Sequence, residues 1–308
     1  MKAAIVKAYG SKVEVADIPK PALLADSLMI QVHASSVNPV DNLIRAGYLK
    51  AMLPLPMPYV VGNDVSGVVT AVGKDVPGFE VGDSVFARPQ GMQSGTFAEF
   101  VVVKAADAAH KPKNLSHEQA ASLPLVALTA WQALVSKGKL QSGQKVLIHG
   151  GSGGVGSIAI QLAKHLGATV ATTTSAENLA MVRALGADTV IDYKTQKFED
   201  ILHGYDLVFD TMGGETRMRS YGVLKKGGQI VSIIYPEDAS GTAEKLGVKS
   251  EVFFMWPSGE QLAKIGQLAE QGVVKPLIDK TFSLDQAQQA LDYSQTGRAK
   301  GKIVIKVA

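Results

Sequence analysis

The feature that most constrains the fold is a glycine-rich loop between a strand-like run and a helix-like segment. The apolar run Lys145–His149 precedes Gly150, and a helical pattern begins near Ser157. The intervening residues have the spacing G-x-G-x-x-G, in which the glycines permit a tight turn, close approach to a pyrophosphate, and close packing of helix on strand. A helix N-terminus also attracts phosphate. A glycine turn of this kind can be purely structural, but its setting favours a dinucleotide site formed by Gly151, Ser152, Gly153, Gly154, Val155 and Gly156.

The chain around this loop alternates strand-like and helix-like segments, which is typical of a parallel sheet with crossover helices. We therefore expect an α/β Rossmann domain with a doubly wound sheet. The expected strands are 146–149, 169–173, 189–193, 207–210 and 229–234, and the expected helices are 157–166, 179–185 and 215–224.

The first third of the chain contains short β-like runs separated by Gly and Pro, which predicts a compact β-rich domain. Ser116 is expected to cap a helix near the domain boundary, and Ser283 with Gln286 forms a capping box before another helix. The final run Lys302–Val307 is β-branched and needs a sheet to join. The predicted organisation is a discontinuous β-rich substrate domain, 1–117 and 273–308, and a Rossmann domain, 118–272.

The end of the second Rossmann strand bears on the choice of cofactor. An NAD-selective site has Asp or Glu there to bind the ribose 2′-hydroxyl. This chain has Thr173, Thr174 and Ser175 instead, whose hydroxyls can donate to a 2′-phosphate, with Asn178 as a neutral donor. Glu177 and the lack of a neighbouring Arg or Lys oppose this interpretation, but the pattern favours NADPH over NADH.

Composition excludes several function classes. The net charge is +3, with 31 Lys and Arg interspersed among 28 Asp and Glu, so a nucleic-acid partner is not expected. The chain has no Cys, which excludes thiolate nucleophiles and sulfur-bound zinc. No signal-peptide pattern or apolar run of about eighteen residues is present, so we expect a cytoplasmic protein without a membrane segment.

Taken together, the motifs resemble the zinc-independent quinone oxidoreductase branch of the medium-chain dehydrogenase/reductase superfamily, over essentially the whole chain. Each string is common alone, but their order and spacing are specific. In order they are SVNPVD at 36–41, GNDVSGVV at 62–69, GDSVFA at 82–87, LPL at 123–125, LTAW at 128–131, AIQLA at 159–163, LGAD at 185–188, VIDY at 190–193 and GRAKGKIV at 297–304.

The resemblance implies a GroES-like catalytic domain, a Rossmann domain and a homodimer formed through the Rossmann sheet edge. Zinc-dependent relatives carry Cys at the position of Asn38 and His at that of Asn63, and they insert a four-cysteine lobe absent here. The six histidines also lack metal-ligand spacing. The implied cofactor contacts outside the glycine loop and the second strand are Asn38, Thr129, Tyr193, Thr211, Ser232, Ile233 and Lys302, of which Tyr193 and Lys302 approach the 2′-phosphate.

The expected chemistry follows from the lack of a metal. Hydride addition to a ketone gives a strongly basic alkoxide, whereas addition to a quinone or an enone gives a phenolate-like or enolate anion that neutral hydrogen bonds can stabilise. The leading hypothesis is an NADPH-dependent quinone reductase, followed by an NADPH-dependent reductase of the C=C bond of α,β-unsaturated aldehydes or ketones. A non-enzymatic NADPH sensor or structural protein is the alternative from another class, and a zinc alcohol dehydrogenase is opposed by the missing ligands.

The substrate pocket is the least defined part of this hypothesis. Asn38 and, tentatively, Tyr48 are the candidate catalytic residues. Tyr59 is a second tyrosine that can bind the substrate carbonyl, and the aromatic run after the Rossmann strands can supply an apolar lid. The predicted pocket residues are Tyr48, Tyr59, Phe254, Met255 and Trp256.

Overall fold

A computed structural model describes residues 1–90, 95–236 and 240–308. These residues form two compact units, one made of Met1–Leu128 with Trp256–Ala308 and the other of Thr129–Met255. Among the described residues, no helix is long and apolar enough to span a membrane.

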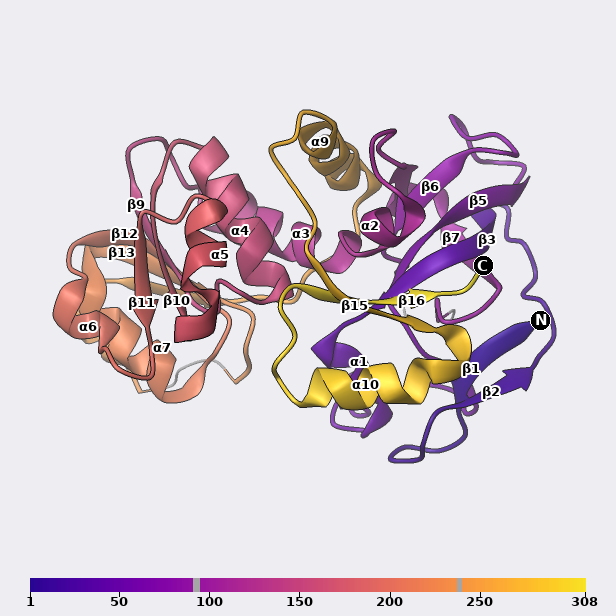
Figure 1. Cartoon of the computed structure of the whole chain (residues 1–308), viewed down its shortest axis with the longest axis horizontal. Coiled ribbons are helices and arrows are strands. Elements are labelled where there is room, and N and C mark those ends of the chain that lie inside the picture. Colours follow the sequence, from indigo (N-terminus) through magenta and orange to yellow (C-terminus); the bar gives the residue numbers. More distant parts are fainter. Residues whose placement is uncertain (91–94, 237–239) are drawn as a thin grey trace. The chain divides into compact units, whose positions relative to one another are not determined.

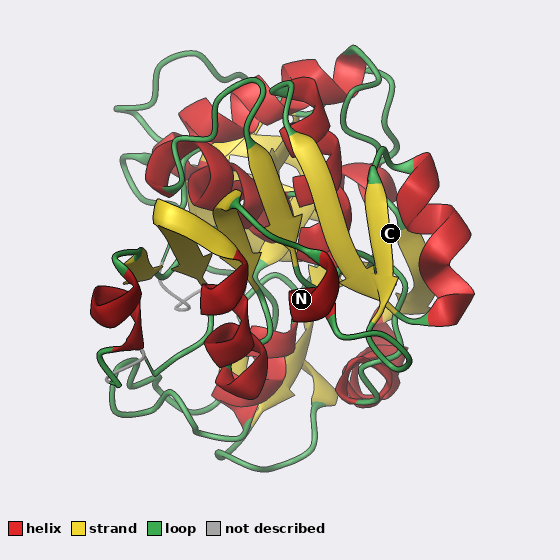
Figure 2. Cartoon of the chain, turned by 90° about the vertical axis from the view of Figure 1, so that its left-hand side faces the viewer, coloured by secondary structure: helices red, strands yellow, loops and turns green. Residues whose placement is uncertain are grey.

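The unit Thr129–Met255 is built on a six-stranded sheet of order β11-β10-β9-β12-β13-β14 in which every pairing is parallel. Helices α4 and α5 lie on one side of the strands and α6 and α7 on the other (Figure 1), and Figure 2 turns this unit toward the viewer. The predicted doubly wound sheet is confirmed. Its strands are β9 Lys145–Ile148, β10 Thr169–Thr174, β11 Thr189–Asp192, β12 Tyr205–Asp210, β13 Leu224–Ser232 and β14 Lys249–Val252, and its helices are η2 Gln132–Lys137, α4 Gly154–His165, η3 Ala176–Asn178, α5 Leu179–Ala184, α6 Phe198–Ile201, α7 Gly214–Ser220, η4 Tyr221–Val223 and α8 Thr242–Leu246.

The other unit contains a seven-stranded sheet, β15-β16-β3-β5-β6-β8 with β7 also paired to β3, and a small sheet β2-β1-β4. The C-terminal strand β16 pairs antiparallel with β3, which confirms that the chain's end joins the N-terminal β-rich part. The strands are β1 Lys2–Val6, β2 Glu14–Asp17, β3 Ser27–Val37, β4 Tyr59–Val60, β5 Asp64–Val72, β6 Ser84–Ala87, β7 Phe100–Lys104, β8 Ala108–His110, β15 Ile278–Ser283 and β16 Lys302–Lys306.

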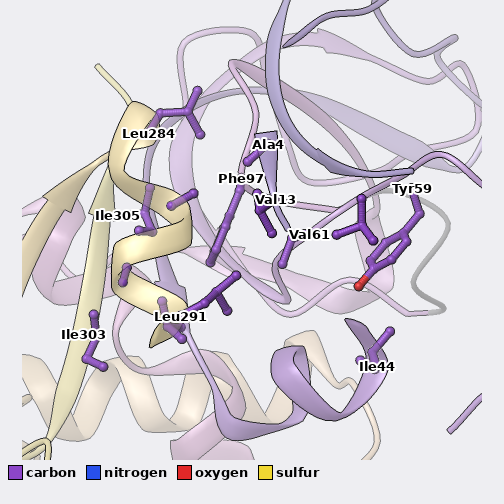
Figure 3. Close-up of a cluster of buried hydrophobic side chains, with 14 of the residues drawn as sticks. Ala4, Val13, Ile44, Tyr59, Val61, Phe97, Leu284, Leu291, Ile303 and Ile305 are labelled. Carbon is purple, nitrogen blue, oxygen red and sulfur yellow. The ribbon is translucent and has the colours of Figure 1, made fainter. Parts of the chain in front are cut away.

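The helices of this unit begin where the sequence offers caps. Ser283 forms the predicted capping box with Gln286, and Ser116 caps α2 as predicted, with Gln119 completing a capping box that was not predicted. Leu284 and Leu291 pack with Phe97 in a buried apolar cluster (Figure 3). The helices are α1 Pro39–Arg45, η1 Ala105–Asp107, α2 His117–Ala121, α3 Pro124–Trp131, which runs into the other unit, α9 Gly259–Glu270, η5 Leu284–Gln286 and α10 Ala287–Gln295.

The bounds of the two units differ from the predicted breaks after residues 117 and 272. Helix α2 packs on β3 and β5, and α9 packs on β8. Both helices therefore belong with the β-rich unit, although their helical periodicity resembles that of the Rossmann helices. Helical periodicity shows that a helix has an apolar face but not which sheet covers it.

Candidate active site

The glycine loop is a tightly bonded turn at the carboxyl edge of the parallel sheet. Gly150 has φ +67°, in the left-handed region that favours glycine. Its carbonyl accepts from Gly153 N–H at 3.0 Å, and Gly151 N–H donates to the carbonyl of Thr173 on β10 at 3.0 Å. The loop is therefore held to the neighbouring strand by backbone bonds.

The three motif glycines have different steric roles. A Cβ at Gly156 would lie 2.2 Å from the Gly150 oxygen, and a Cβ at Gly151 would lie 2.1 Å from Thr172 Oγ1. Both positions require glycine for the fold itself. A Cβ at Gly153 would have its nearest neighbour, the Gly150 oxygen, at 3.4 Å, which is an ordinary contact. The fold thus has room for a methyl group at Gly153, and a ligand lying against this backbone would explain the glycine.

Helix α4 begins at this loop and supplies the expected anion-binding end. Its N-cap is Gly153, no side chain caps it, and its first turn has no acidic residue. A helix of twelve residues carries a partial positive charge at its N-terminus. The uncapped end and the open position at Gly153 fit a pyrophosphate. Ser152, Gly154 and Val155 are partly exposed there.

The predicted hydroxyls at the end of β10 point to different partners. Thr173 Oγ1 lies 3.1 Å from His149 Nδ1, and Ser175 Oγ donates to Glu177 at 3.2 Å while accepting from Asn178 at 3.0 Å. Thr174 Oγ1 is buried and has no hydrogen-bond partner. Thr174 is therefore the one of these hydroxyl residues whose side chain lacks a hydrogen bond within the protein.

Tyr193, predicted to lie near the 2′-phosphate, follows the adjacent strand β11. Its side chain is 59% exposed, and its N–H donates to the carbonyl of Thr174 at 3.2 Å. Tyr193 therefore lies beside the end of β10.

The ends of β12 and β13 form a second polar group at the same sheet edge. Ser232 Oγ donates to Asp210 Oδ2 at 2.7 Å, and Arg217 Nε donates to the same oxygen at 2.8 Å. Although burial opposes it, hydrogen bonds from Gly213 N–H and Arg217 lower the pKa of Asp210. The predicted contact Ile233 donates its N–H to the Asp210 carbonyl at 3.2 Å. These bonds fix the strand ends beside the loop.

The predicted contact Thr211 follows β12 and lies next to the glycine loop. Its hydroxyl donates to the His149 carbonyl at 2.8 Å, and its Oγ1 would be 3.0 Å from a Cβ at Gly150. Thr129, another predicted contact, is buried.

The β-rich unit holds a buried polar cluster formed by Asn38, Asp41, Asn63, Asp64 and Lys302. Asn38 Nδ2 donates to Asp64 Oδ2 at 2.7 Å, and its Oδ1 accepts from Lys302 Nζ at 2.5 Å. Asp41 accepts from Asn38 N–H at 2.7 Å and from Asn63 Nδ2 at 2.6 Å. The two asparagines, which stand where zinc-dependent relatives carry metal ligands, are thus joined through the carboxylate of Asp41.

Burial shifts the ionisation of this cluster. Burial raises the pKa of Asp41 to about 6, and the charge of Asp64 acts in the same direction. Hydrogen bonds from Asn38 and Asn63 act in the opposite direction and lower this pKa. Burial also lowers the pKa of the Lys302 amine, while Asp64 and Asp41 oppose that change. Two carboxylates and one amine therefore share a site with little solvent.

The position of Lys302 argues against the phosphate contact that the resemblance implied. Its side chain is 5% exposed, and Nζ donates to the Val37 carbonyl at 2.9 Å, to Asn38, and to Asp64 Oδ2 at 3.4 Å. An ammonium group has three donors. In this structure all three are directed at Val37, Asn38 and Asp64, so a phosphate contact would require one of these bonds to break.

The predicted pocket residues differ in exposure. Tyr48 is 79% exposed, whereas Tyr59 is buried and its hydroxyl has no hydrogen-bond partner. Burial, reinforced by the charge of Asp41, raises the pKa of Tyr59. Phe254 stacks on Tyr235 with ring centroids 4.3 Å apart, which makes Tyr235 a residue that sequence reasoning missed. Met255 is partly exposed, and Trp256 is exposed and begins the C-terminal part of the β-rich unit.

Positions 38 and 63, where zinc-dependent relatives carry metal ligands, hold side chains that do not fit zinc. Zinc in proteins is bound by Cys sulfur, His nitrogen or carboxylate oxygen. Asn38 and Asn63 direct their amide nitrogens at carboxylates instead. Within residues 1–90, 95–236 and 240–308, no group of three His, Cys, Asp or Glu side chains is arranged to hold a metal ion.

Comparison with known proteins places the chain in a family. Residues 25–113 match the alcohol dehydrogenase GroES-like domain, and residues 185–305 match a domain described as zinc-binding dehydrogenase. The mitochondrial NAD(P)H oxidoreductase RTN4IP1 of Danio rerio is 35% identical over 100% of this chain and 91% of its own length. The 2-methylene-furan-3-one reductase of Solanum lycopersicum is 40% identical over 99% of this chain and 79% of its own length.

A solved structure agrees with these relatives. The quinone oxidoreductase from Coxiella burnetii superposes with a TM-score of 0.91 at 34% identity, covering 100% of this chain and 99% of that one. The resemblance found in the sequence is thereby confirmed for both domains. The chain is an enzyme of the medium-chain dehydrogenase/reductase superfamily and belongs to its quinone oxidoreductase-like branch.

Proposed function

We propose that this enzyme is an NADPH-dependent reductase that works without a metal ion and reduces quinones. The observation that carries the proposal is Gly153, where the fold itself leaves room for a methyl group, next to the uncapped N-terminus of α4. When bound, the reduced nicotinamide supplies a hydride. The protein's own residues bind and orient, an effect worth up to roughly 7–11 kcal/mol of the barrier.

Three features at or beside the end of β10 support NADPH. No Asp or Glu ends β10, where an NAD-selective site would place one. Thr174 offers a buried hydroxyl without a partner, and Tyr193 lies exposed beside it. Glu177 is the contrary feature, and the hydrogen bond from Ser175 holds its carboxylate in place. We therefore expect a preference for NADPH rather than an absolute requirement.

The polar cluster supports a substrate whose product anion is weakly basic. Lys302 and Asp64 occupy both ends of the Asn38 side chain. Such a side chain orients a neighbouring group but releases no proton. Neutral hydrogen bonds are sufficient for the anion of a quinone, which resembles a phenolate with a pKa of about 10. Tyr59 is the neutral donor that we propose for the substrate carbonyl, ahead of Tyr48, because its buried hydroxyl lacks a partner.

Reduction of the C=C bond of an enal or enone is the second candidate. The tomato relative is named as a reductase of such a compound and is 40% identical to this chain. Both reactions deliver hydride to a conjugated carbon and leave an anion of similar basicity. The stacked pair Tyr235 and Phe254 offers a flat apolar surface suited to either substrate.

The test is consumption of NADPH by the purified protein with a naphthoquinone and then with a short 2-alkenal. We expect turnover of the quinone at a higher kcat/KM than of the alkenal, with NADPH preferred over NADH and with no loss of activity in EDTA. A higher kcat/KM for the alkenal would establish the second candidate. Failure to bind either nucleotide, or inactivation by the chelator, would refute the proposal.

Location and assembly complete the proposal. We propose a cytoplasmic homodimer whose subunits meet at β14, one of the two edge strands of the parallel sheet. The name of the zebrafish relative marks that protein as mitochondrial, so location needs its own measurement. Light scattering after gel filtration measures the assembly, and imaging of a tagged protein in its native cell measures the location.

A further inference from the structure

A buried histidine that the proposed reaction does not use lies directly beneath the glycine loop. His149 follows β9 and is 0% exposed. Its Nδ1 lies 3.1 Å from Thr173 Oγ1, and its Nε2 lies 2.8 Å from Ser220 Oγ at the end of α7. Both ring nitrogens are therefore engaged with hydroxyl groups, and the ring makes a T-shaped contact with Phe198, with centroids 4.8 Å apart.

The direction of each hydrogen bond follows from counting protons. Ser220 has one hydroxyl proton, and it donates that proton to the Thr216 carbonyl at 2.6 Å. Ser220 Oγ must then accept from His149, so the imidazole carries its proton on Nε2. His149 Nδ1 is consequently an acceptor, and the hydroxyl proton of Thr173 points at it.

Thr173 in turn holds two consecutive amides of the loop. Its Oγ1 accepts from Gly150 N–H at 3.3 Å, and its carbonyl accepts from Gly151 N–H at 3.0 Å. The Gly150 carbonyl accepts from Gly153 N–H, so the turn that ends at α4 is built on Gly150. The orientation of one hydroxyl thus connects His149 to the whole turn.

We propose that His149, as the neutral tautomer protonated on Nε2, is a positioning residue that holds the glycine loop in its phosphate-binding shape through Thr173. The inference rests on the proposed function, because it assigns to that loop the pyrophosphate of NADPH. His149 lies outside the glycine motif, and so does its partner Ser220, which ends helix α7.

The electrostatic surroundings keep this arrangement intact near neutral pH. Burial lowers the pKa of His149 to about 4, Arg219 lowers it further, and Asp210 and Glu199 oppose the shift. A protonated ring would donate from both nitrogens and reverse the bond to Thr173. The hydroxyl would then lose its acceptor on His149.

The first test compares the affinities of Thr173→Val, Thr173→Ser and Ser220→Ala for NADPH and for NADH by fluorescence titration. One net hydrogen bond corresponds to about a 3- to 10-fold change in Kd. We expect Thr173→Val to raise the Kd values for NADPH and for NADH by that factor. The two Kd values should rise equally, because both nucleotides contain the pyrophosphate. Thr173→Ser should restore the affinity, and Ser220→Ala should weaken it by a smaller factor.

A matched control comes from the β-rich unit. Ser66 Oγ also donates to a carbonyl, that of Val85, and lies 2.8 Å from a histidine nitrogen, His117 Nδ1. Ser66→Ala removes the same kind of bond in the unit that does not contain the loop, and it should leave both Kd values unchanged. An equal loss in Ser66→Ala would reduce the effect to general destabilisation and overturn the proposal.

The second test measures the tautomer itself by nitrogen NMR of labelled histidine. We expect the His149 signal to report a protonated Nε2 and a bare Nδ1 that persist down to pH 5. A proton on Nδ1, titration near the ordinary pKa of 6.5, or an effect of Thr173→Val confined to NADPH would each refute the positioning role. If the unmodified protein binds neither nucleotide, the proposed function fails instead.

Discussion

The glycine loop and the buried polar cluster are both polar sites, but the chain builds them in opposite ways. The loop is one contiguous segment whose shape is set by backbone hydrogen bonds and three glycines. The cluster joins side chains that are hundreds of residues apart, as in the bond between Lys302 and Asn38. A substitution in the loop therefore acts through backbone shape, whereas a substitution in the cluster acts through buried charge.

The largest expected effect is a loss of folding stability when one partner of a buried ion pair is removed. Lys302→Met leaves Asp64 without its cation, and Arg217→Met does the same to Asp210. Breaking a buried pair from one side costs about 3–5 kcal/mol. We expect losses of this size for both variants in urea unfolding, and less than about 0.5 kcal/mol for Lys306→Met, which changes an exposed lysine on the strand of Lys302. A loss below 1 kcal/mol for Lys302→Met would show that the cluster does not depend on its charge.

The two regions should also respond to pH with opposite signs. Asp41 has a pKa raised by burial to about 6, so its stabilising effect is complete below the ordinary value of 3.8 and is lost as pH rises through 6. His149 has a pKa lowered by burial to about 4, so its effect is complete above 6.5 and is lost as pH falls toward 4. Each shift corresponds to roughly 3 kcal/mol.

The measurement is urea unfolding of the protein and of Asp41→Asn and His149→Asn between pH 4 and 8. Subtracting the unmodified protein isolates one group in each variant. Asp41 makes the unmodified protein less stable as pH rises, and we expect this decrease to be absent in Asp41→Asn. His149 makes it more stable as pH rises, and we expect this increase to be absent in His149→Asn. Parallel curves for all three proteins would contradict both assignments.

The same contrast explains which parts of the molecule could be predicted from the sequence. The parallel sheet, the turn of the glycine loop, the helix cap at Ser116 and the capping box at Ser283 are signalled by residues close together in the chain, and these structural predictions are confirmed. The helices α2 and α9 show the limit, because periodicity reveals a buried face but not the sheet that covers it. The predicted domain breaks were displaced for that reason.

The polar cluster could be predicted only in part. Asn38 was identified through the resemblance, but no sequence pattern linked it to Asp64 or Lys302, because those contacts form only when β5 and β16 pair with β3. The resemblance instead assigned Lys302 to a phosphate. The spacing of Asn38 and Asp41, which makes a capping box on α1, was the one local signal that sequence reasoning missed.

Two glycines of the loop provide a prediction of intermediate size. Gly156→Ala places a methyl group 2.2 Å from the Gly150 oxygen, and overpacking of this kind costs about 1–3 kcal/mol. Gly153→Ala meets only an ordinary contact, so its melting temperature should be unchanged while its Kd for NADPH rises at least about tenfold, as expected for the loss of roughly 1.4 kcal/mol. An unchanged Kd for Gly153→Ala would remove the main support for the nucleotide site.

A small change in stability is expected at Tyr59, and the variant Tyr59→Phe separates the role of this residue from that of Tyr48. The Tyr59 hydroxyl is buried without a partner, so Tyr59→Phe should alter the free energy of unfolding by less than about 1 kcal/mol, with stabilisation as the expected sign. Tyr48 is 79% exposed, and Tyr48→Phe should be neutral. If Tyr59 donates to the substrate carbonyl, its variant lowers kcat with the quinone while the Kd for NADPH stays constant. A lower kcat in Tyr48→Phe alone would transfer that role to Tyr48 and place the substrate contact on the exposed tyrosine rather than beside the buried cluster.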